Sequence, residues 1–192
     1  MKRAARKDKR LVIDILALQF SQVPGTTWML RKNKHLNRNI RLLTSVAFEV
    51  SYCRQGVFIA SNDEGIALCF KHNLKVFSLR EVLVKLWFTT TAVKWSKFLK
   101  MLKLEKFKRS VRPKSGNYLY FWFFAVLKGG KDAGFELKNE IFAMAKKQNL
   151  PIYAETSLPR NKAVYERYGF HTYSYWEDKK DQLKIWFMCY EP

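Results

Sequence analysis

Apolar residues in the first part of the chain recur at helical spacing. Leu11, Ile15 and Leu18 follow one another at intervals of four and three residues, which predicts an amphipathic helix over residues 6–20. After a turn at residues 24–25 a second helix is predicted, because an apolar stripe continues across four turns at Leu36, Ile40, Leu43, Ala47 and Val50.

Short apolar segments bounded by turn residues predict the strands. Residues 57–60 and 66–70 flank the turn-forming segment 61–65, which is typical of a hairpin. Residues 118–127 are apolar on both faces of a strand, as in the centre of a covered sheet. The remaining strands are expected at residues 152–156, 172–176 and 183–190, the last two as a closing hairpin.

The segment between residues 78 and 112 is helical but less regular, and we interpret it as an insertion before the central strand. Three threonines at residues 89–91 weaken the helix in its middle. The second half is expected to end or bend near residues 101–104. Before the threonines the residues that can face a core are Val82, Leu86 and Phe88, and after them one helix face carries Trp95, Phe98, Leu99 and Leu102. Two further helices are predicted over residues 133–148 and 160–168.

Length and composition allow one well-packed domain over residues 1–192, since 48% of the residues are hydrophobic and no linker rich in proline, glycine or serine divides the chain. Three scattered cysteines and three scattered histidines predict neither a disulfide framework nor a metal site. Asp14 interrupts the apolar segment near the N-terminus, unlike a secretory signal. The longest apolar run, residues 118–127, is half the roughly 20 residues that a membrane-spanning helix needs. We therefore expect a soluble, cytoplasmic protein with no membrane association and with buried thiols.

Positive charge is concentrated in the first part of the chain. Residues 1–112 hold 24 Lys and Arg against 7 Asp and Glu, a net +17, whereas residues 113–192 hold 12 against 9, a net +3. Such asymmetry can mark a surface that binds polyanions, so a nucleic-acid-associated protein is one hypothesis. A solvated, lysine-rich surface with no such partner is the other.

The most specific motif is YAETSLPRNKAVYERYGF, residues 153–170. It places a strand, a polar turn and a helix that opens on Pro159-Arg160-Asn161 before a Tyr-Glu-x-x-Gly-Phe ending. This string resembles the last part of the acetyl-coenzyme A fold of the GNAT superfamily of N-acetyltransferases. The resemblance implies an α/β fold with a central mixed, mostly antiparallel sheet flanked by helices. It also implies that Asn161 holds the pantetheine arm and that Tyr165 faces the thioester sulfur.

The family's phosphate-binding loop has a counterpart between the central strand and the next helix. Val126 is followed, at the family spacing, by Lys131 and Gly134. Backbone N–H groups at such a helix start point at the pyrophosphate, and glycine lets the backbone approach closely. Asp132 and Glu136 depart from the family's small residues, and we expect both to repel phosphate. The residues that the resemblance assigns to acetyl-coenzyme A are Phe124, Ala125, Val126, Gly130, Lys131, Asp132, Ala133, Gly134, Phe135 and Asn161.

Tyr165 is the main catalytic candidate. Attack of an amine on a thioester expels a thiolate, whose conjugate acid has a pKa of about 8.5, against about 10 for tyrosine. A neutral hydroxyl near the sulfur can stabilise or protonate that thiolate. Glu155, on the strand beside the expected cofactor groove, is the candidate general base, with Glu49 as a more distant one, and Tyr168 is interpreted as packing.

The implied function is transfer of an acetyl group from acetyl-coenzyme A to a primary amine by direct attack. The resemblance places the cofactor in residues 113–192 and the acceptor against residues 1–112. A small-molecule amine is the expected acceptor, in preference to a protein. Two alternatives stay open: an acyl-coenzyme A-binding protein without transfer activity, and the nucleic-acid-associated protein indicated by the charge.

Overall fold

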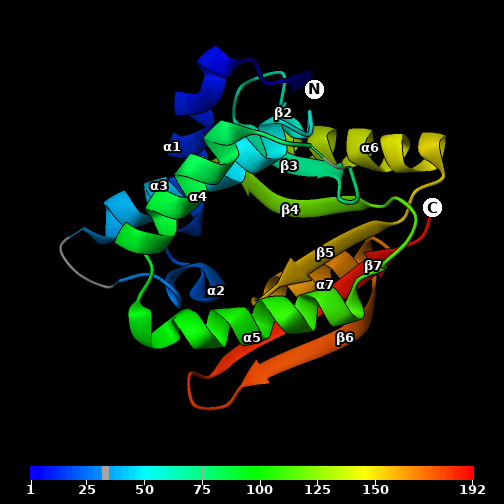
Figure 1. The fold of residues 1–192 in the computed structure, drawn as a ribbon. Coiled ribbons are helices and arrows are strands. Elements are labelled where there is room, and N and C mark those ends of the chain that lie inside the picture. Colours follow the sequence, from blue (N-terminus) through cyan, green and yellow to red (C-terminus); the bar gives the residue numbers. More distant parts are fainter. Residues whose placement is uncertain (32–34, 75) are drawn as a thin grey trace.

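One seven-stranded sheet carries strands from both parts of the chain (Figure 1). The computed structural model describes residues 1–31, 35–74 and 76–192. The strand order across the sheet is β1-β2-β3-β4-β5-β7-β6. The strands are β1 (Lys2–Arg3), β2 (Val57–Ile59), β3 (Gly65–Lys71), β4 (Leu119–Val126), β5 (Ile152–Thr156), β6 (His171–Asp178) and β7 (Leu183–Tyr190).

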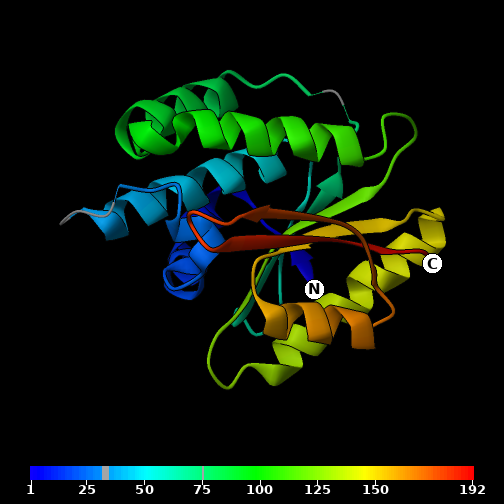
Figure 2. The ribbon, with the colours of Figure 1, turned by 90° about the horizontal axis from the view of Figure 1, so that it is seen from below.

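Helices cover both faces of this sheet. They are the 3-10 turn η1 (Arg6–Asp8) and the α-helices α1 (Lys9–Phe20), α2 (Pro24–Thr27), α3 (Leu36–Tyr52), α4 (Leu79–Thr91), α5 (Trp95–Val111), α6 (Lys131–Gln148) and α7 (Pro159–Arg167). Seen from below, α4 and α5 form the outermost layer on one side of the molecule, while α6 and α7 lie on the other side (Figure 2). The predicted helices and strands are therefore present, and the turn expected at residues 24–25 is the start of the short helix α2.

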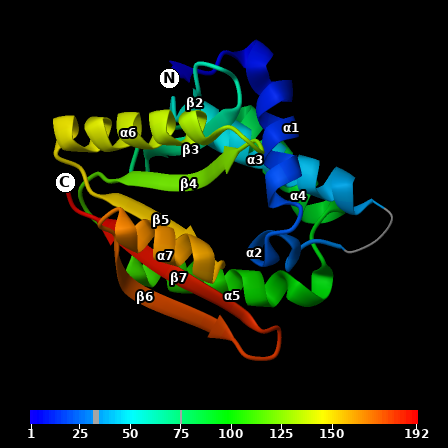
Figure 3. The ribbon, with the colours of Figure 1, turned by 180° about the vertical axis from the view of Figure 1, so that it is seen from behind.

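Strands β4 and β5 pair in parallel, and this is the one parallel pair in the described part of the chain. Their pairing covers three residues and ends at Phe121 opposite Ala154. Beyond that point the two strands diverge (Figures 1 and 3). On its other edge, β4 has a register shift against β3 after Phe121: Cys69 pairs with Phe121, but Leu68 pairs with Phe123. The extra residue, Trp122, forms a β-bulge, and a bulge bends a strand. The bend falls where β4 leaves β5.

Alternating side chains of the strands form a core on each face. On one face of the sheet, α6 buries Leu137, Ile141 and Ala145 against the strands. On the opposite face α1 and α3 pack on the same strands, with Leu16 and Phe48 both fully buried. Two of the thiols, Cys69 and Cys189, are buried, whereas Cys53 is half-buried; all three are free.

The buried face of α1 differs from the predicted one. Val12, Ile15 and Leu16 are buried, but Leu18 is 64% exposed. Both sets have helical spacing, so the sequence alone could not decide how the helix is rotated about its axis. In α3 the predicted stripe is confirmed, with Ile40 and Ala47 among the buried residues.

The segment that follows β3 also departs from the prediction. The break at the threonines is confirmed, because α4 ends at Thr91, and Phe88 is buried as expected. Val82 and Leu86 are instead exposed. The expected end or bend near residues 101–104 is wrong, since α5 continues to Val111. Leu104 is buried against β7 residues and anchors the middle of this helix.

We predict that Gly56→Ala destabilises the protein by about 2 to 3 kcal/mol. A Cβ atom at Gly56 would lie 2.4 Å from Cβ of Phe70 and 2.5 Å from the carbonyl oxygen of Cys69, so β3 would have to move. Urea unfolding measures the change. The matched control is Gly134→Ala, whose Cβ would meet no atom closer than 3.4 Å and which should gain up to about 1 kcal/mol of helix propensity. Equal effects of the two substitutions would contradict the close packing of Gly56.

Candidate active site

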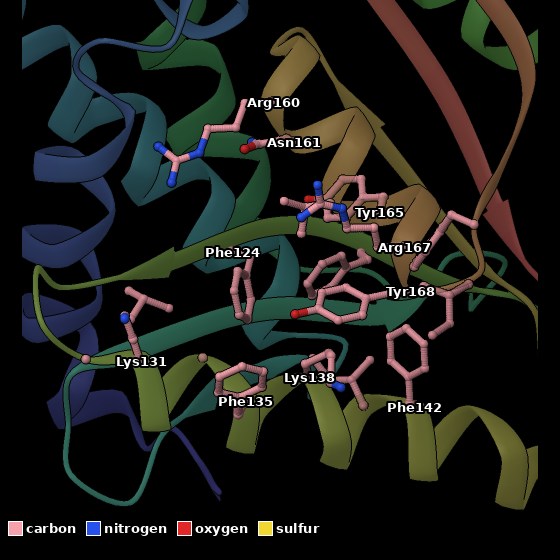
Figure 4. A pocket seen from close by; sticks show the side chains of 18 of the residues that line it. Phe124, Lys131, Phe135, Lys138, Phe142, Arg160, Asn161, Tyr165, Arg167 and Tyr168 are labelled. Atoms are coloured by element: carbon pink, nitrogen blue, oxygen red, sulfur yellow. The ribbon is translucent and has the colours of Figure 1, made fainter.

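A cavity of about 830 Å³ lies between β4, α6 and α7 (Figure 4). It opens beside the stretch of β4 that has separated from β5. Eight of the residues predicted from the sequence line it: Phe124, Val126, Gly130, Lys131, Gly134, Phe135, Asn161 and Tyr165. Four predicted residues do not: Ala125, Asp132, Ala133 and Glu155. The two alanines are buried in the cores, so only their backbone is available to a ligand.

The loop after β4 brings the start of α6 to the cavity. The Leu127 N–H donates to the Glu64 carbonyl oxygen at 2.8 Å, and Gly129 adopts a φ of +95°, which favours glycine. A Cβ at Gly130 would approach Val126 and Glu64 to 3.1 and 3.2 Å. Helix α6 then begins at Lys131. The Lys131 N–H donates to the Gly129 carbonyl oxygen at 2.9 Å, whereas the N–H groups of Asp132 and Ala133 have no backbone acceptor in the described structure. These N–H groups form the positive end of the helix dipole. This end of the cavity is suited to an anion.

The charged side chains that line the cavity are all cations: Lys131, Lys138, Arg160 and Arg167. The carboxylate of Glu136, which was expected to repel phosphate, lies outside the cavity lining. It accepts a hydrogen bond from the Ser61 N–H at 3.0 Å and pairs with the ammonium group of Met1. These contacts lower the pKa of Glu136 to about 2. Asp132 is exposed and also lies outside the lining. Neither carboxylate therefore contacts the cavity directly, and the repulsion of phosphate by these two residues stays a prediction.

Tyr165 lies on α7 at the inner end of the cavity. Its ring is 6.3 Å from that of Phe121, the last β4 residue paired with β5, and 5.3 Å from that of Phe170. Burial raises the pKa of Tyr165 to about 12. The phenol is therefore neutral at physiological pH and can donate a hydrogen bond. A neutral hydroxyl at this position can stabilise or protonate a departing thiolate.

Asn161 lies in the first turn of α7, and its side chain is not the helix cap. Helix α7 begins at Pro159, and Leu158 occupies the N-cap position without a side-chain cap. Asn161 instead lines the cavity, as does the neighbouring Arg160 (Figure 4). Its amide is thus available to a ligand.

Glu155 lies on the opposite face of the sheet from Tyr165. Ala154, its neighbour on β5, packs towards α6, so the alternation of the strand turns Glu155 towards α5. There the carboxylate pairs with Lys108 at 3.0 Å and with Arg112. Burial alone would raise the pKa of Glu155, but the two cations outweigh it and lower the pKa. The other carboxylate considered, Glu49, is buried and paired with Arg6 and Lys9 at 2.6 and 2.8 Å.

Several lining residues were not identified from the sequence. Lys138 places its ammonium nitrogen 4.6 Å from the ring centre of Tyr168, and Phe142 follows on the same side of α6. Tyr168 lines the cavity as well, so the interpretation that it only packs is incomplete. The sequence contains a pattern that could have identified the lining residues of α6. One face of this helix carries, at helical spacing, Lys131, Phe135, Lys138 and Phe142.

Away from the cavity, ligand atoms of His171, Cys189 and Glu191 lie within 4.8 Å of one another. Cys189 pairs with His171 across β6 and β7, which explains the approach of residues 18 positions apart. The scattered spacing in the sequence gave no sign of this group. It lies outside the cavity lining.

Comparison with known proteins shows the fold. No protein-family model and no curated protein sequence matches the chain. A Corynebacterium glutamicum protein described as histone acetyltransferase HPA2 and related acetyltransferase is 22% identical, with 100% of this chain and 94% of that chain covered and a TM-score of 0.67. Arylalkylamine N-acetyltransferase 2 from Aedes aegypti is 15% identical, with 99% and 97% covered and a TM-score of 0.65. The C-terminal condensation domain of Ebony, solved with beta-alanyl-dopamine, is 13% identical, with 98% and 96% covered and a TM-score of 0.70. The GNAT-like fold expected from the sequence is confirmed.

We predict that Glu155→Gln lowers the free energy of unfolding at pH 7 by about 3 kcal/mol, because it leaves the largely buried Arg112 without a carboxylate partner and Lys108 with only the half-exposed Glu105. The pKa of Glu155 is lowered in the folded protein, so its stabilising effect is present above its unfolded pKa of about 4.3 and is lost as the pH falls through the folded value. The difference between wild type and variant should therefore shrink below about pH 4.

Urea unfolding between pH 3 and pH 8 measures this difference. Glu105→Gln is the control, since Glu105 is half-exposed and also pairs with Lys108; its effect should stay below about 1 kcal/mol. A Glu155 variant as stable as wild type at pH 7 would show that the buried ion pairs do not hold α5 in place.

Proposed function

We propose that the protein is an N-acyltransferase that moves an acetyl group from acetyl-coenzyme A to a primary amine. The observation that carries the proposal is the cationic cavity beside the diverging edge of β4, with a neutral tyrosine at its inner end. A site that binds an elongated, polyanionic thioester needs all three features: positive charge for the phosphates, a free strand edge for the pantetheine arm, and a hydrogen-bond donor for the sulfur. The resemblance of residues 153–170 to the GNAT motif points to the same chemistry.

The cavity offers suitable groups for each part of coenzyme A. The first turn of α6 offers N–H groups to the pyrophosphate, and Lys131 and Arg160 add positive charge. Past Phe121, β4 has no strand partner on its β5 side in the described structure, so its backbone can pair with the pantetheine amides as a neighbouring strand would. Asn161 can bind the same arm. The acyl end then lies near Tyr165.

The reaction follows from this placement. The ammonium form of the acceptor first loses a proton, and the neutral amine nitrogen then attacks the thioester carbonyl carbon and forms the C–N bond. The nitrogen, now positively charged, loses a second proton to solvent and becomes the amide nitrogen. The C–S bond breaks, and the electron pair leaves with the sulfur as a thiolate. Tyr165 stabilises this thiolate by donating a hydrogen bond, and a solvent proton completes the free thiol. The backbone of residues 124–126 can donate to the carbonyl oxygen as negative charge develops there.

Glu155 remains the proposed base, acting on the amine from the α5 side of the gap between the strands. Its two ion pairs oppose this role, since they hold the carboxylate in its charged form and make it a weaker base. A pH–rate profile separates the possibilities: loss of the acid limb in Glu155→Gln indicates a base, whereas an unchanged profile with lower stability indicates a structural role. In the second case water would take the proton.

A small aromatic amine is the acceptor class that the comparisons favour. One similar structure is described as an arylalkylamine acetyltransferase, and another holds beta-alanyl-dopamine. Measuring free thiol release from acetyl-coenzyme A with a panel of amines tests transfer, and calorimetry tests binding. Binding without release for any amine would favour the alternative, an acyl-coenzyme A-binding protein without transfer activity.

We predict that Tyr165→Phe lowers the turnover number by about 10- to 1,000-fold with little change in acetyl-coenzyme A affinity. The phenyl ring keeps the packing and loses the hydroxyl that donates to the thiolate. Steady-state kinetics with the best amine of the panel measures the effect. Tyr175→Phe, an exposed tyrosine outside the cavity, is the control. Unchanged turnover in Tyr165→Phe would remove Tyr165 from the mechanism.

We predict that Gly134→Val weakens acetyl-coenzyme A binding by about tenfold, the equivalent of about 1.4 kcal/mol of crowding at the phosphates. The fold should tolerate the side chain, because a Cβ at Gly134 meets Val126 at 3.4 Å, an ordinary contact. Calorimetry gives the affinity. Ala143→Val introduces valine at an exposed position of α6 outside the cavity lining, and it controls for the presence of a β-branched residue in this helix. Equal affinity in the two variants would place the phosphates elsewhere.

A further inference from the structure

Exposed apolar side chains gather in one region of the molecule. Among the described residues, most of the large apolar side chains that face solvent belong to residues 74–102. They are Leu74, Phe77, Leu79, Val82, Leu83, Leu86, Trp87, Trp95, Leu99 and Leu102, with exposed fractions from 45% to 80%. Soluble monomers rarely leave so many neighbouring apolar residues in water, and such patches mark interaction surfaces.

These residues form the outward side of two helices. In α4 the exposed positions 79, 82, 83, 86 and 87 share one helix face, and the opposite side buries Phe88 against the core. In α5 the exposed positions 95, 99 and 102 share a face opposite the buried Leu104. Both helices belong to the outer layer on the same side of the molecule (Figures 1 and 2). We call the exposed side chains of α4 and α5 the α4–α5 face.

Positive charge accompanies this apolar surface. Exposed basic residues on and beside the two helices are Arg80, Lys85, Lys94, Lys103, Lys106 and Arg109. Along the outward side of α5 the apolar residues give way to Lys106 and Arg109 at the same helical spacing. Of the two acidic residues on these helices, Glu81 is buried and paired with Arg54 and Lys85. Glu105 is exposed and pairs with Lys108 at 3.2 Å, so the exposed charges of the two helices remain predominantly positive.

We propose that the α4–α5 face docks on an anionic lipid bilayer and lies in its interface. Leucine, valine and tryptophan insert at the headgroup level, while lysine and arginine side chains meet the lipid phosphates; a surface with both features binds anionic membranes. Tryptophan favours this level of the membrane, and both Trp87 and Trp95 are more than half exposed. No described helix has the length and apolar character to cross a membrane, so the contact is peripheral.

The charges favour lipid over other partners. A second copy of the chain would bring one basic surface against another, and like charges repel. A nucleic acid would supply the negative charge. Phosphates and bases, however, bind to cationic, polar and aromatic side chains, and aliphatic side chains predominate on this surface. An anionic bilayer satisfies both the charge and the apolar area.

Vesicle co-sedimentation tests the proposal with the full chain. We expect binding to vesicles of phosphatidylcholine with phosphatidylglycerol, and little binding to phosphatidylcholine alone. Lys103→Ala with Lys106→Ala should weaken binding by about 30-fold, since each charge contributes about 1 kcal/mol. Leu86→Gln with Leu99→Gln should weaken it by at least about tenfold. Acyl-chain-brominated lipid should quench tryptophan fluorescence, and Trp87→Phe with Trp95→Phe should remove most of that quenching.

Matched variants outside the face provide the controls. Leu18→Gln changes an exposed leucine of α1, and Lys146→Ala with Lys147→Ala removes two exposed charges from α6 on the other side of the molecule. Both should bind vesicles like wild type. Absence of binding to anionic vesicles overturns the proposal, as does binding that the leucine variants leave unchanged. Tighter binding to single-stranded poly(dT), weakened by the same lysine variants, would assign the face to nucleic acid. Self-association that the leucine variants abolish would assign it to a second copy.

Discussion

The rest of the candidate site depends on the early end of the pairing between β4 and β5. Two parallel strands joined by a helix would ordinarily pair along their length, and here the pairing ends after three residues. The bulge at Trp122 bends β4 at that point, while β5 continues to pair with β7 as far as Thr156. One edge of β4 is thereby left with backbone groups that no strand satisfies. Because α6 and α7 both begin beyond this point, the same divergence directs their first turns towards the opening.

Much of this arrangement could be predicted from the sequence. The apolar residues 118–127, the glycine loop after them and the 153–170 motif gave the order of elements and eight of the lining residues. The lining residues came from the resemblance to the family motif, and local rules supplied the strand end, the helix starts and the helix faces on which these residues lie. The bulge itself could not be predicted, because Trp122 looks like any other aromatic residue in an apolar run. Its effect depends on which residues of β3 it faces.

The charged and exposed residues were harder to predict than the core. Glu136 was expected at the phosphates, but Ser61 and the chain's amino group attract its carboxylate to the other side of α6. Glu155 lies on the strand predicted for it, but its carboxylate faces Lys108 and Arg112 at α5. Val82 and Leu86 have core-like periodicity and lie in solvent. Periodicity shows that a helix has an apolar side, but only the tertiary structure decides what that side faces.

The thiol of Cys69 is buried beside the point where β4 and β5 diverge. It pairs with Phe121, the residue at which β4 leaves β5, and it is 1% exposed. Burial raises its pKa, so almost none of the reactive thiolate is present in the closed structure. Its side chain packs with Leu137 and Ile141 of α6, so an alkylating reagent can reach it only when the core between the sheet and α6 opens. The alkylation rate of this cysteine is thus a measure of how often that core opens, and it needs no engineered label.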